Sequence, residues 1–341
     1  MRNNLKWAYD ILSKFANREV LVVGDLMLDR YIYGEVDRIS PEAPVPVVEV
    51  KKEKYMPGGG ANVARNIQAM GGKASLCGVI GDDQHGNDLL RVLAEAGVKT
   101  DLVLKVPGVN TTVKTRVLAG RQQIVRIDWD KRIELPDDMK KEWLVRIQAA
   151  VKMADGVVLE DYDKGLVDQD LMSVVIGAAQ ASGVPCGFDP KRNTELRLDG
   201  ITLVTPNRKE AFLLAGMHES PACVEPLKDV QLLEVSDRLR KKWNARFLVI
   251  TLGPQGMLLI QEGEEPQHIP TEAREVFDVS GAGDTVIATM VLAMAAGAES
   301  RKAVELANCA AGVVVGKIGT ASCSADELLN FLQCRNDPAY T

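Results

Sequence analysis

Strand and helix signals alternate along most of the 341-residue sequence, and few folds accommodate that order. An apolar strand signal at 20–24 is followed by Asp25, and the strand signals of the second half lie at 156–160, 185–188, 201–205 and 246–252. Such alternation is typical of a parallel sheet whose two faces are covered by helices. We therefore predict an α/β fold with a doubly wound, mostly parallel sheet, in one large domain or two modest ones.

A glycine-rich turn, Asp-Val-Ser-Gly-Ala-Gly-Asp at 278–284, stands between a predicted short strand at 275–277 and a predicted buried helix at 285–296. The first N–H groups of a helix lack partners within it, and the helix dipole attracts negative charge to that end. The turn is therefore a candidate phosphate site, formed by Gly281, Ala282, Gly283 and the carboxylate of Asp284. The alternative is an ordinary helix cap, in which Ser280 or Asp278 accepts a backbone hydrogen bond.

A second glycine-rich stretch, Pro-Gly-Gly-Gly-Ala-Asn at 57–62, opens an Ala-rich helix. Its glycines let a ligand approach the backbone, and Asn62 can donate to a hydroxyl group. Neither stretch has the third glycine of a dinucleotide fingerprint, and Lys73 is followed by alanine where a P-loop needs serine or threonine. A Rossmann or P-loop nucleotide site is therefore not expected.

Polar residues follow the ends of successive predicted strands. The carboxyl ends of parallel strands meet at one edge of a sheet, where α/β proteins bind ligands. We expect one cleft to gather Asp29, Asp161, Lys191, Asn207, Glu210, Gly253 and Asp284. Each also has a purely structural explanation: Asn207 and Glu210 match a helix capping box, for example, and 253–256 match a hairpin turn.

Two Val-rich stretches, 31–55 and 106–130, differ from the rest of the chain. Prolines interrupt the first, which suits an edge or a projecting ribbon better than a central strand. We predict that the two form one small antiparallel sheet projecting from the main domain, as a lid, a dimer surface or both. Because an isolated ribbon cannot bury an apolar face alone, we expect a homodimer joined through these strands.

Composition excludes several classes of protein. The net charge is −6 and the pI about 5.4, so no overall basic field attracts nucleic acid or anionic lipid. Six scattered cysteines without a C-x-x-C pair, and only three histidines, argue against structural zinc and fit a reducing cytoplasm. Residues 1–17 have the spacing of an amphipathic helix and not of a signal peptide, and no apolar run reaches membrane-spanning length.

The two glycine-rich motifs together resemble the signature motifs of the pfkB, or ribokinase-like, carbohydrate kinases. The first motif is 57–62, followed by Gly71-Gly72 and Gly81-Asp82, and the second is 278–285. The resemblance extends from Glu19 to about Ser324. It implies a single ribokinase-like domain over 1–341, with 31–55 and 106–130 as the lid. It also implies ATP and Mg²⁺ as the cofactors.

The resemblance implies a role for each matching position. Asp284 would be the catalytic base that takes the sugar hydroxyl proton, with Gly281, Ala282 and Gly283 as the anion hole. Asn207 and Glu210, from an N-x-x-E motif, would organise magnesium through water or phosphate. The nucleotide would contact Asn207, Arg208, Lys209, Glu210, Thr251, Gly253, Gly256 and Asn308. The sugar would contact Asp29, Gly59, Gly60 and Asn62.

Within the family, three further segments resemble the kinases of D-glycero-D-manno-heptose 7-phosphate: 38–48, 115–126 and 161–165. That resemblance implies phosphorylation at the anomeric O1 to the 1,7-bisphosphate, in ADP-heptose and lipopolysaccharide-core biosynthesis. Bifunctional relatives carry a C-terminal adenylyltransferase domain, which is not expected here because the sequence ends soon after Leu332. The candidate cations for the sugar phosphate are Arg116, Lys164, Lys191 and Arg192.

Other functions stay open at this stage. The protein is alternatively another sugar kinase of the family, such as a fructokinase, a ribokinase or a sugar-phosphate kinase. A noncatalytic sugar or nucleotide binder on the same scaffold is disfavoured because Asp284 and Glu210 are intact. An NAD-dependent oxidoreductase is disfavoured because the dinucleotide fingerprint is missing.

Overall fold

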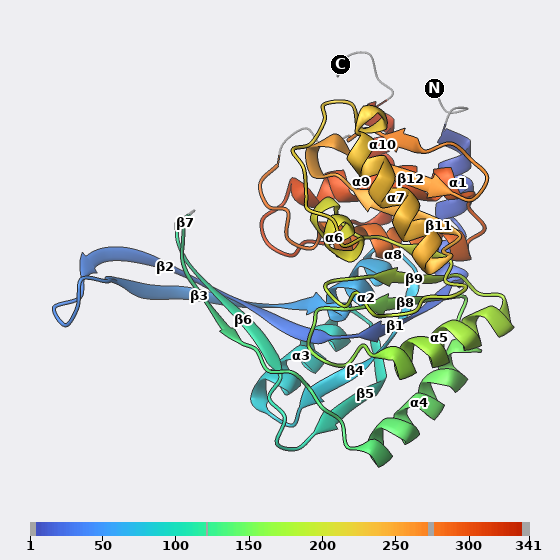
Figure 1. The fold of residues 1–341 in the computed structure, drawn as a ribbon. Coiled ribbons are helices and arrows are strands. Elements are labelled where there is room, and N and C mark those ends of the chain that lie inside the picture. Colours follow the sequence, from blue (N-terminus) through green and yellow to red (C-terminus); the bar gives the residue numbers. More distant parts are fainter. Residues whose placement is uncertain (1–4, 121, 272–275, 336–341) are drawn as a thin grey trace.

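The computed structural model describes residues 5–120, 122–271 and 276–335, and its core is a sheet with helices on both faces (Figure 1). Within the described residues the main sheet has the strand order β13-β12-β11-β10-β9-β8-β1-β4-β5. Its strands are β1 (Glu19–Gly24), β4 (Lys73–Gly81), β5 (Lys99–Val106), β8 (Gly156–Glu160), β9 (Cys186–Asp189), β10 (Leu203–Val204), β11 (Phe247–Thr251), β12 (Met257–Gln261) and β13 (Gln267–Ile269). All neighbours pair in parallel except at the β11-β12-β13 edge, which is antiparallel. The predicted doubly wound, mostly parallel sheet is confirmed.

Two hydrophobic cores lie on the two faces of this sheet. Along β1 the side chains alternate between them: Val20 and Val22 pack into one core, and Leu21 and Val23 into the other. The first core is covered by α1 (Lys6–Leu12), α2 (Gly60–Ala69), α3 (Gln84–Glu95), α8 (Ala282–Ala295), α9 (Ser300–Val315) and α10 (Ala325–Arg335). The second is covered by α4 (Asp137–Val151), α5 (Gln169–Ser182), α6 (Arg208–Leu214) and α7 (Val230–Trp243). The continuous apolar runs of the strands follow from this burial on both faces.

A small second sheet projects from the body of the molecule (Figure 1). Its order is β3-β2-β6-β7, formed by β2 (Leu26–Ile39), β3 (Pro46–Gly59), β6 (Thr112–Ala119) and β7 (Gln122–Trp129). The predicted sheet is thus present, but it is mixed and not antiparallel, because β2 and β6 pair in parallel. The chain leaves β3 through α2 and returns to the sheet at β6 only after β4, α3 and β5, so β6 re-enters in the direction of β2.

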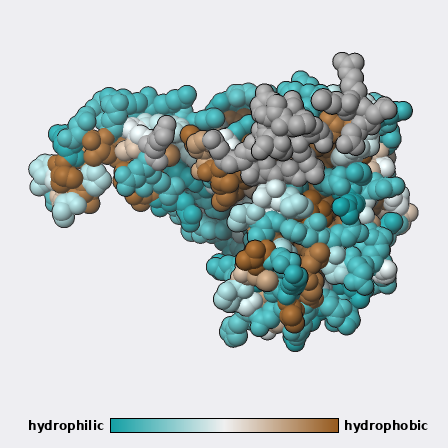
Figure 2. All heavy atoms as spheres, turned by 90° about the horizontal axis from the view of Figure 1, so that it is seen from above, coloured by the Kyte–Doolittle hydropathy of each residue, from teal (hydrophilic) through white to brown (hydrophobic). Residues whose placement is uncertain are grey.

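Several large apolar side chains are exposed on the small sheet, and brown patches mark apolar residues along its projecting end in Figure 2. They are Val36, Ile39, Val45, Val50, Val125, Ile127 and Trp129. The projecting strands therefore have apolar surface that the monomer does not cover.

One local prediction differs from the structure. Of the strand expected at 275–277, Glu275 lies outside the described residues, and Val276 and Phe277 are not in a strand. Instead the N–H of Phe277 donates to the carbonyl oxygen of Val315, so the segment is held by the end of α9. Of the helix predicted over 1–17, residues 1–4 lie outside the described part of the chain. The prediction is confirmed for α1 at Lys6–Leu12, and a 3₁₀ turn follows at Phe15–Asn17. No helix of the described residues combines the length and the apolar character that crossing a bilayer requires.

Candidate active site

The turn before α8 requires glycine at Gly281. This residue has φ +79°, in the left-handed region, and a Cβ placed on it would lie 2.7 Å from Nδ2 of Asn62. No side chain caps α8, so the predicted alternative is confirmed only in that Asp278 accepts backbone hydrogen bonds. Asp278 stabilises the turn by accepting from the N–H groups of Ser280 (2.9 Å) and Gly319 (3.0 Å). The helix end therefore remains accessible to an anion.

The carboxylate of Asp284 is buried in the first turn of α8 and is held at both oxygens. Asn62 Nδ2 donates to Oδ2 (2.7 Å), and the hydroxyl of Tyr162 donates to Oδ1 (2.7 Å). Asn62 is itself oriented by Arg65, whose Nη2 donates to Asn62 Oδ1 (3.0 Å). A carboxylate fixed in this way has one orientation toward a substrate, as a general base needs.

Two more buried carboxylates, Glu160 and Asp189, lie beside Asp284. One oxygen of each of the three residues lies within 4.8 Å of the others. Burial, followed by the charge of Asp189, raises the pKa of Glu160 well above its usual range. Burial also raises the pKa of Asp189 to about 7, against the opposing effect of the Lys191 charge. Both carboxyl groups therefore favour the protonated form more than an exposed carboxyl group does.

Lys191 provides the positive charge of this cluster. Its Nζ lies 3.6 Å from Asp189 Oδ2 and 3.2 Å from Glu210 Oε1. These carboxylates, with Glu160 and Asp284, raise the pKa of Lys191 above its usual range despite its burial, so the ammonium stays charged. A fixed cation at the edge of an acidic cluster is suited to receive a phosphate group.

Asn207 and Glu210 form the predicted capping box at the start of α6. Asn207 Oδ1 accepts from the N–H of Glu210 (2.9 Å), and Glu210 Oε2 accepts from the N–H of Asn207 (2.9 Å). The other carboxylate oxygen of Glu210 faces Lys191. The structural explanation of this motif is confirmed, and it leaves Glu210 directed at the site through that second oxygen.

A cavity of about 480 Å³ joins these groups at the carboxyl ends of β9, β10 and β11. Most of the residues predicted for catalysis and nucleotide binding line it: Asn207, Arg208, Lys209, Glu210, Thr251, Gly253, Gly281, Ala282, Gly283 and Asp284. Lys191, predicted for the sugar phosphate, lines it too. Within that set Arg208 is engaged elsewhere, since its Nη2 lies 2.9 Å from Asp229 Oδ2. The cavity lies at the carboxyl-end edge of the sheet, which is where a ligand-binding cleft was predicted from the sequence.

The residues predicted for the sugar lie on the other side of Asp284, at the base of the small sheet. Asp29 and Arg116 form an ion pair (2.5 Å) between β2 and β6. Gly59 has φ +59° and would place a Cβ within 3.4 Å of the Tyr162 ring, and the N–H of Gly60 donates to the carbonyl of Asp25 (3.0 Å). With Asn62 these residues surround Asp284 and Tyr162 and do not line the cavity just described.

Further predicted site residues also lie outside that cavity. Asn308 donates through Nδ2 to the carbonyl of Pro270 (2.6 Å), and Gly256 packs against the backbone of Ile269 and Pro270. Lys164 lines a neighbouring cavity, where its Nζ lies 2.5 Å from Asp130 Oδ2. For Asn308 and Gly256, a nucleotide-binding role stays a prediction.

The sequence analysis missed Glu160 and Tyr162 as site residues, although it selected Asp161 between them. Glu160 ends β8, and Asp161 and Tyr162 follow it, so all three lie at the edge of the sheet where ligands bind. The side chains of Glu160 and Tyr162 face Asp284, whereas Asp161 accepts from the N–H of Asp163 (2.8 Å) and stabilises the loop. Successive side chains of a strand point to opposite faces, and this alternation could have separated Glu160 and Tyr162 from Asp161.

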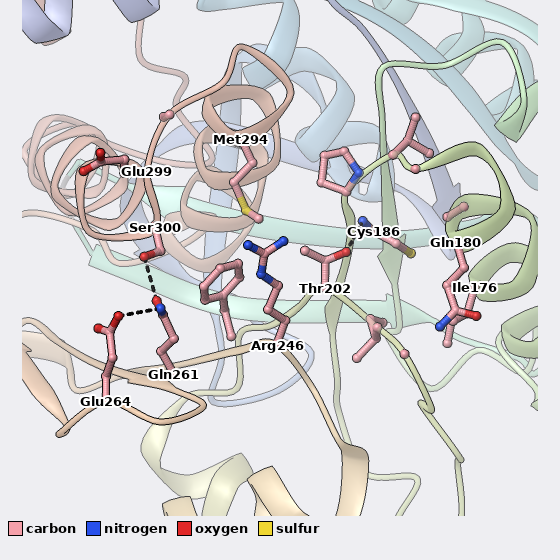
Figure 3. Close-up of a pocket in the computed structure, with 18 residues that line it drawn as sticks. Ile176, Gln180, Cys186, Thr202, Arg246, Gln261, Glu264, Met294, Glu299 and Ser300 are labelled. Carbon is pink, nitrogen blue, oxygen red and sulfur yellow. Dashed lines mark hydrogen bonds between the residues drawn. The ribbon is translucent and has the colours of Figure 1, made fainter.

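Another cavity, of about 680 Å³, lies at the opposite, amino-terminal ends of β9, β10 and β11. Figure 3 shows Arg246 in it between Met294 and Thr202, with Ser300, Gln261 and Glu264 joined by hydrogen bonds. Its lining contains none of the buried carboxylates that surround Asp284. The smaller cavity at the carboxyl ends of the strands is therefore the candidate active site.

Similar proteins were found by sequence and by structure. The sequence is 45% identical to the "Bifunctional protein HldE" of Caulobacter vibrioides over 315 residues, 92% of this chain and 63% of that protein. The protein of the same name from Pelobacter propionicus is 40% identical over 321 residues, 94% of this chain and 64% of that protein. The chain thus spans slightly less than two thirds of the length of these curated relatives.

Two solved structures share the fold. A ribokinase of Arabidopsis thaliana, complexed with ribose and ATP, has a TM-score of 0.69 at 24% identity and covers 93% of this chain and 99% of its own. Phosphofructokinase-2 of Escherichia coli, in complex with potassium, has a TM-score of 0.73 at 22% identity and covers 93% of this chain and 98% of its own. The family model of the pfkB carbohydrate kinases matches residues 17–327. The chain belongs to the pfkB family of carbohydrate kinases.

Proposed function

We propose that the protein transfers the γ-phosphoryl group of ATP to O1 of D-glycero-D-manno-heptose 7-phosphate, giving the 1,7-bisphosphate for ADP-heptose and lipopolysaccharide-core synthesis. The observation that carries the proposal is the buried Asp284 carboxylate, held by Asn62 and Tyr162 at the open N-terminus of α8. The choice of acceptor is supported by the 40–45% identity to bifunctional HldE proteins and by the segments 38–48, 115–126 and 161–165.

In this mechanism the chain mainly positions groups and neutralises charge, since phosphoryl transfer needs little covalent help. Asp284 accepts the proton of the acceptor hydroxyl, and the glycine-rich turn at 281–283 stabilises the transferring group with backbone N–H donors. The ammonium of Lys191 offsets part of the charge that ATP brings into the cavity. Asp29, Gly59, Gly60 and Asn62 hold the sugar next to Asp284.

The donor atoms fit the magnesium ion that the family uses with ATP. Mg²⁺ prefers oxygen ligands and keeps several waters, and Glu210 directs one carboxylate oxygen into the cavity next to Lys191. Asn207 Oδ1 is occupied by the capping box, so we assign the closer role to Glu210, with Asn207 acting through water or phosphate. When bound, the ion offsets charge on the phosphate oxygens.

We further propose that the small sheet is a lid that closes over the sugar and that two copies join through it. Asp29 and Arg116 lie at the inner end of the small sheet, so the position of this sheet determines where Asp29 contacts the sugar. The exposed apolar residues of its outer end, such as Ile39 (62% exposed) and Val50 (51% exposed), support contact with a second copy.

A panel of acceptors tests the proposed function directly. The purified protein is incubated with ATP, Mg²⁺ and one acceptor at a time, and ADP release and the phosphorylated product are both measured. We expect the highest kcat/KM with heptose 7-phosphate and a product that carries a second phosphate on O1. Turnover of fructose or ribose without turnover of heptose 7-phosphate would overturn the assignment, and no transfer to any acceptor would support a binding protein instead.

A further inference from the structure

A second cavity, of about 460 Å³, adjoins the candidate active site. Tyr162 and Lys191 line both cavities, so the two cavities meet at these side chains. The residues that complete the lining of the second cavity are Asp130, Arg132, Asp163, Lys164 and Arg192. This cavity has four cationic side chains against two carboxylates.

Two of the cations are paired with the two carboxylates. Lys164 Nζ lies 2.5 Å from Asp130 Oδ2, and Arg132 Nη1 lies 3.1 Å from Asp163 Oδ1. The side chains of Arg132 and Asp163 are 68% and 47% exposed, so this second pair is weak and readily exchanged. A dianionic ligand can therefore replace the carboxylates as the partner of these cations.

The loop that presents Lys164 has a fixed backbone. Asp25 Oδ2 accepts from the N–H groups of Tyr162 (2.7 Å) and Lys164 (3.1 Å). Asp163, between them, has φ +57°, a conformation that a non-glycine residue keeps only where the surroundings hold it. The direction in which Tyr162 and Lys164 leave the backbone is thus set before any ligand binds.

Tyr162 connects the two cavities along its length. Its hydroxyl donates to Asp284 Oδ1, and Lys191 Nζ lies 4.6 Å from the centre of its ring. A ligand whose reacting hydroxyl lies at Asp284 and whose other end extends along Tyr162 therefore reaches the second cavity. Arg116 is placed differently: it pairs with Asp29, lies over the ring of Tyr31, and is not among the residues of this lining.

We propose that the second cavity binds the phosphate monoester that the acceptor sugar already carries, with Arg132, Lys164 and Arg192 as its ligands. Lys191 lies between this phosphate and the transferring one. The inference rests on the proposed function, because it places the acceptor hydroxyl at Asp284. It assigns Arg116, a sequence-based candidate for this phosphate, to the orientation of Asp29 instead, and it adds Arg132, which the sequence did not suggest.

The test uses the full chain and pairs of acceptors that differ only in the phosphate: heptose 7-phosphate and heptose, fructose 6-phosphate and fructose, ribose 5-phosphate and ribose. Steady-state constants are measured for the parent and for Arg132→Met, Lys164→Met and the double variant, with Lys131→Met as the matched control. Each single variant should raise KM for the phosphorylated acceptor about 10- to 100-fold, as loss of a hydrogen bond to a charged group predicts. KM for ATP, turnover of the unphosphorylated partner and the Lys131→Met variant should stay unchanged.

The outcomes separate this inference from the proposed function. If the parent uses a phosphorylated sugar other than heptose 7-phosphate and the variants weaken its binding, the acceptor assignment fails and the cavity assignment stands. If heptose 7-phosphate is the acceptor but its KM is unchanged in the double variant, the cavity assignment is overturned. It is also overturned if the best acceptor carries no phosphate, or if the variants raise KM for ATP instead. Circular dichroism of each variant shows whether the fold is retained.

Discussion

Replacing Asp284 with asparagine separates catalysis from stability at this site. The substitution keeps the shape of the side chain, removes its ability to accept a proton and replaces one acceptor oxygen with an amide donor. Positioned general bases contribute about 100- to 10,000-fold to turnover, so kcat should fall by that factor. KM for ATP should change little, because the nucleotide cavity keeps Lys191, Glu210 and the glycine-rich turn.

The structure predicts that the Asp284→Asn substitution has only a small effect on the free energy of unfolding. The oxygens of Glu160, Asp189 and Asp284 lie within 4.8 Å of one another, and two full charges at that separation repel by about 3.5 kcal/mol at an effective dielectric constant of about 20. Neutralising Asp284 removes up to that repulsion. It also weakens one of the hydrogen bonds from Asn62 and Tyr162, at a cost of about 1.5–3 kcal/mol. These effects oppose each other, so the free energy of unfolding should change by no more than about 3 kcal/mol in either direction.

The assays are steady-state kinetics with the best acceptor and urea unfolding followed by circular dichroism. Asp326→Asn, which neutralises an exposed carboxylate on α10, is the control and should leave both measurements unchanged. A kcat of Asp284→Asn within a few-fold of the parent would refute the assignment of the base. A loss of stability above about 4 kcal/mol would refute the account of the acidic cluster, since it would mean that the Asp284 charge stabilises its surroundings.

Three further changes test other parts of the structure. Tyr162→Phe removes the hydroxyl that donates to Asp284 and should lower kcat about 10- to 100-fold; an unchanged kcat would mean that Asn62 alone orients the carboxylate. Asp25→Asn tests a pH effect: burial raises the pKa of Asp25 from about 4 to about 6, so its contribution to stability is present below pH 4 and is lost as the pH rises to about 6. Between pH 4 and 7 the free energy of unfolding, measured with urea, should therefore fall by about 3 kcal/mol less in Asp25→Asn than in the parent. An identical pH dependence in the two proteins would contradict this prediction. Val45→Asp together with Val47→Asp should halve the mass seen by light scattering, and an unchanged mass would argue against a dimer through the small sheet.

The sequence predicted the parts of the fold that depend on local pattern. Alternating strand and helix signals gave the main sheet, and the small residues before α8 gave the turn at Gly281, which the structure shows to need both a positive φ and the absence of a Cβ. The direction of β6 was predicted wrongly, since it depends on the path of the intervening chain and not on the strand's own residues. The ion pair of Asp29 with Arg116 is a consequence of that parallel pairing, and nothing near either residue in the sequence indicates it.

The electrostatics of the site was the least predictable part, because it depends on burial. Glu160 and Asp189 are ordinary acidic residues after strands when only the sequence is considered, yet each is almost fully excluded from water. Their side chains converge with Asp284 because β8 and β9 are adjacent and in register at Glu160 and Asp189. Lys191, two residues beyond β9, then lies close enough to offset their charge. The ammonium of Lys191 lines both cavities. It therefore has two roles: it offsets the negative charge of the acidic cluster in the folded protein, and it lies between the two phosphate groups of the proposed complex.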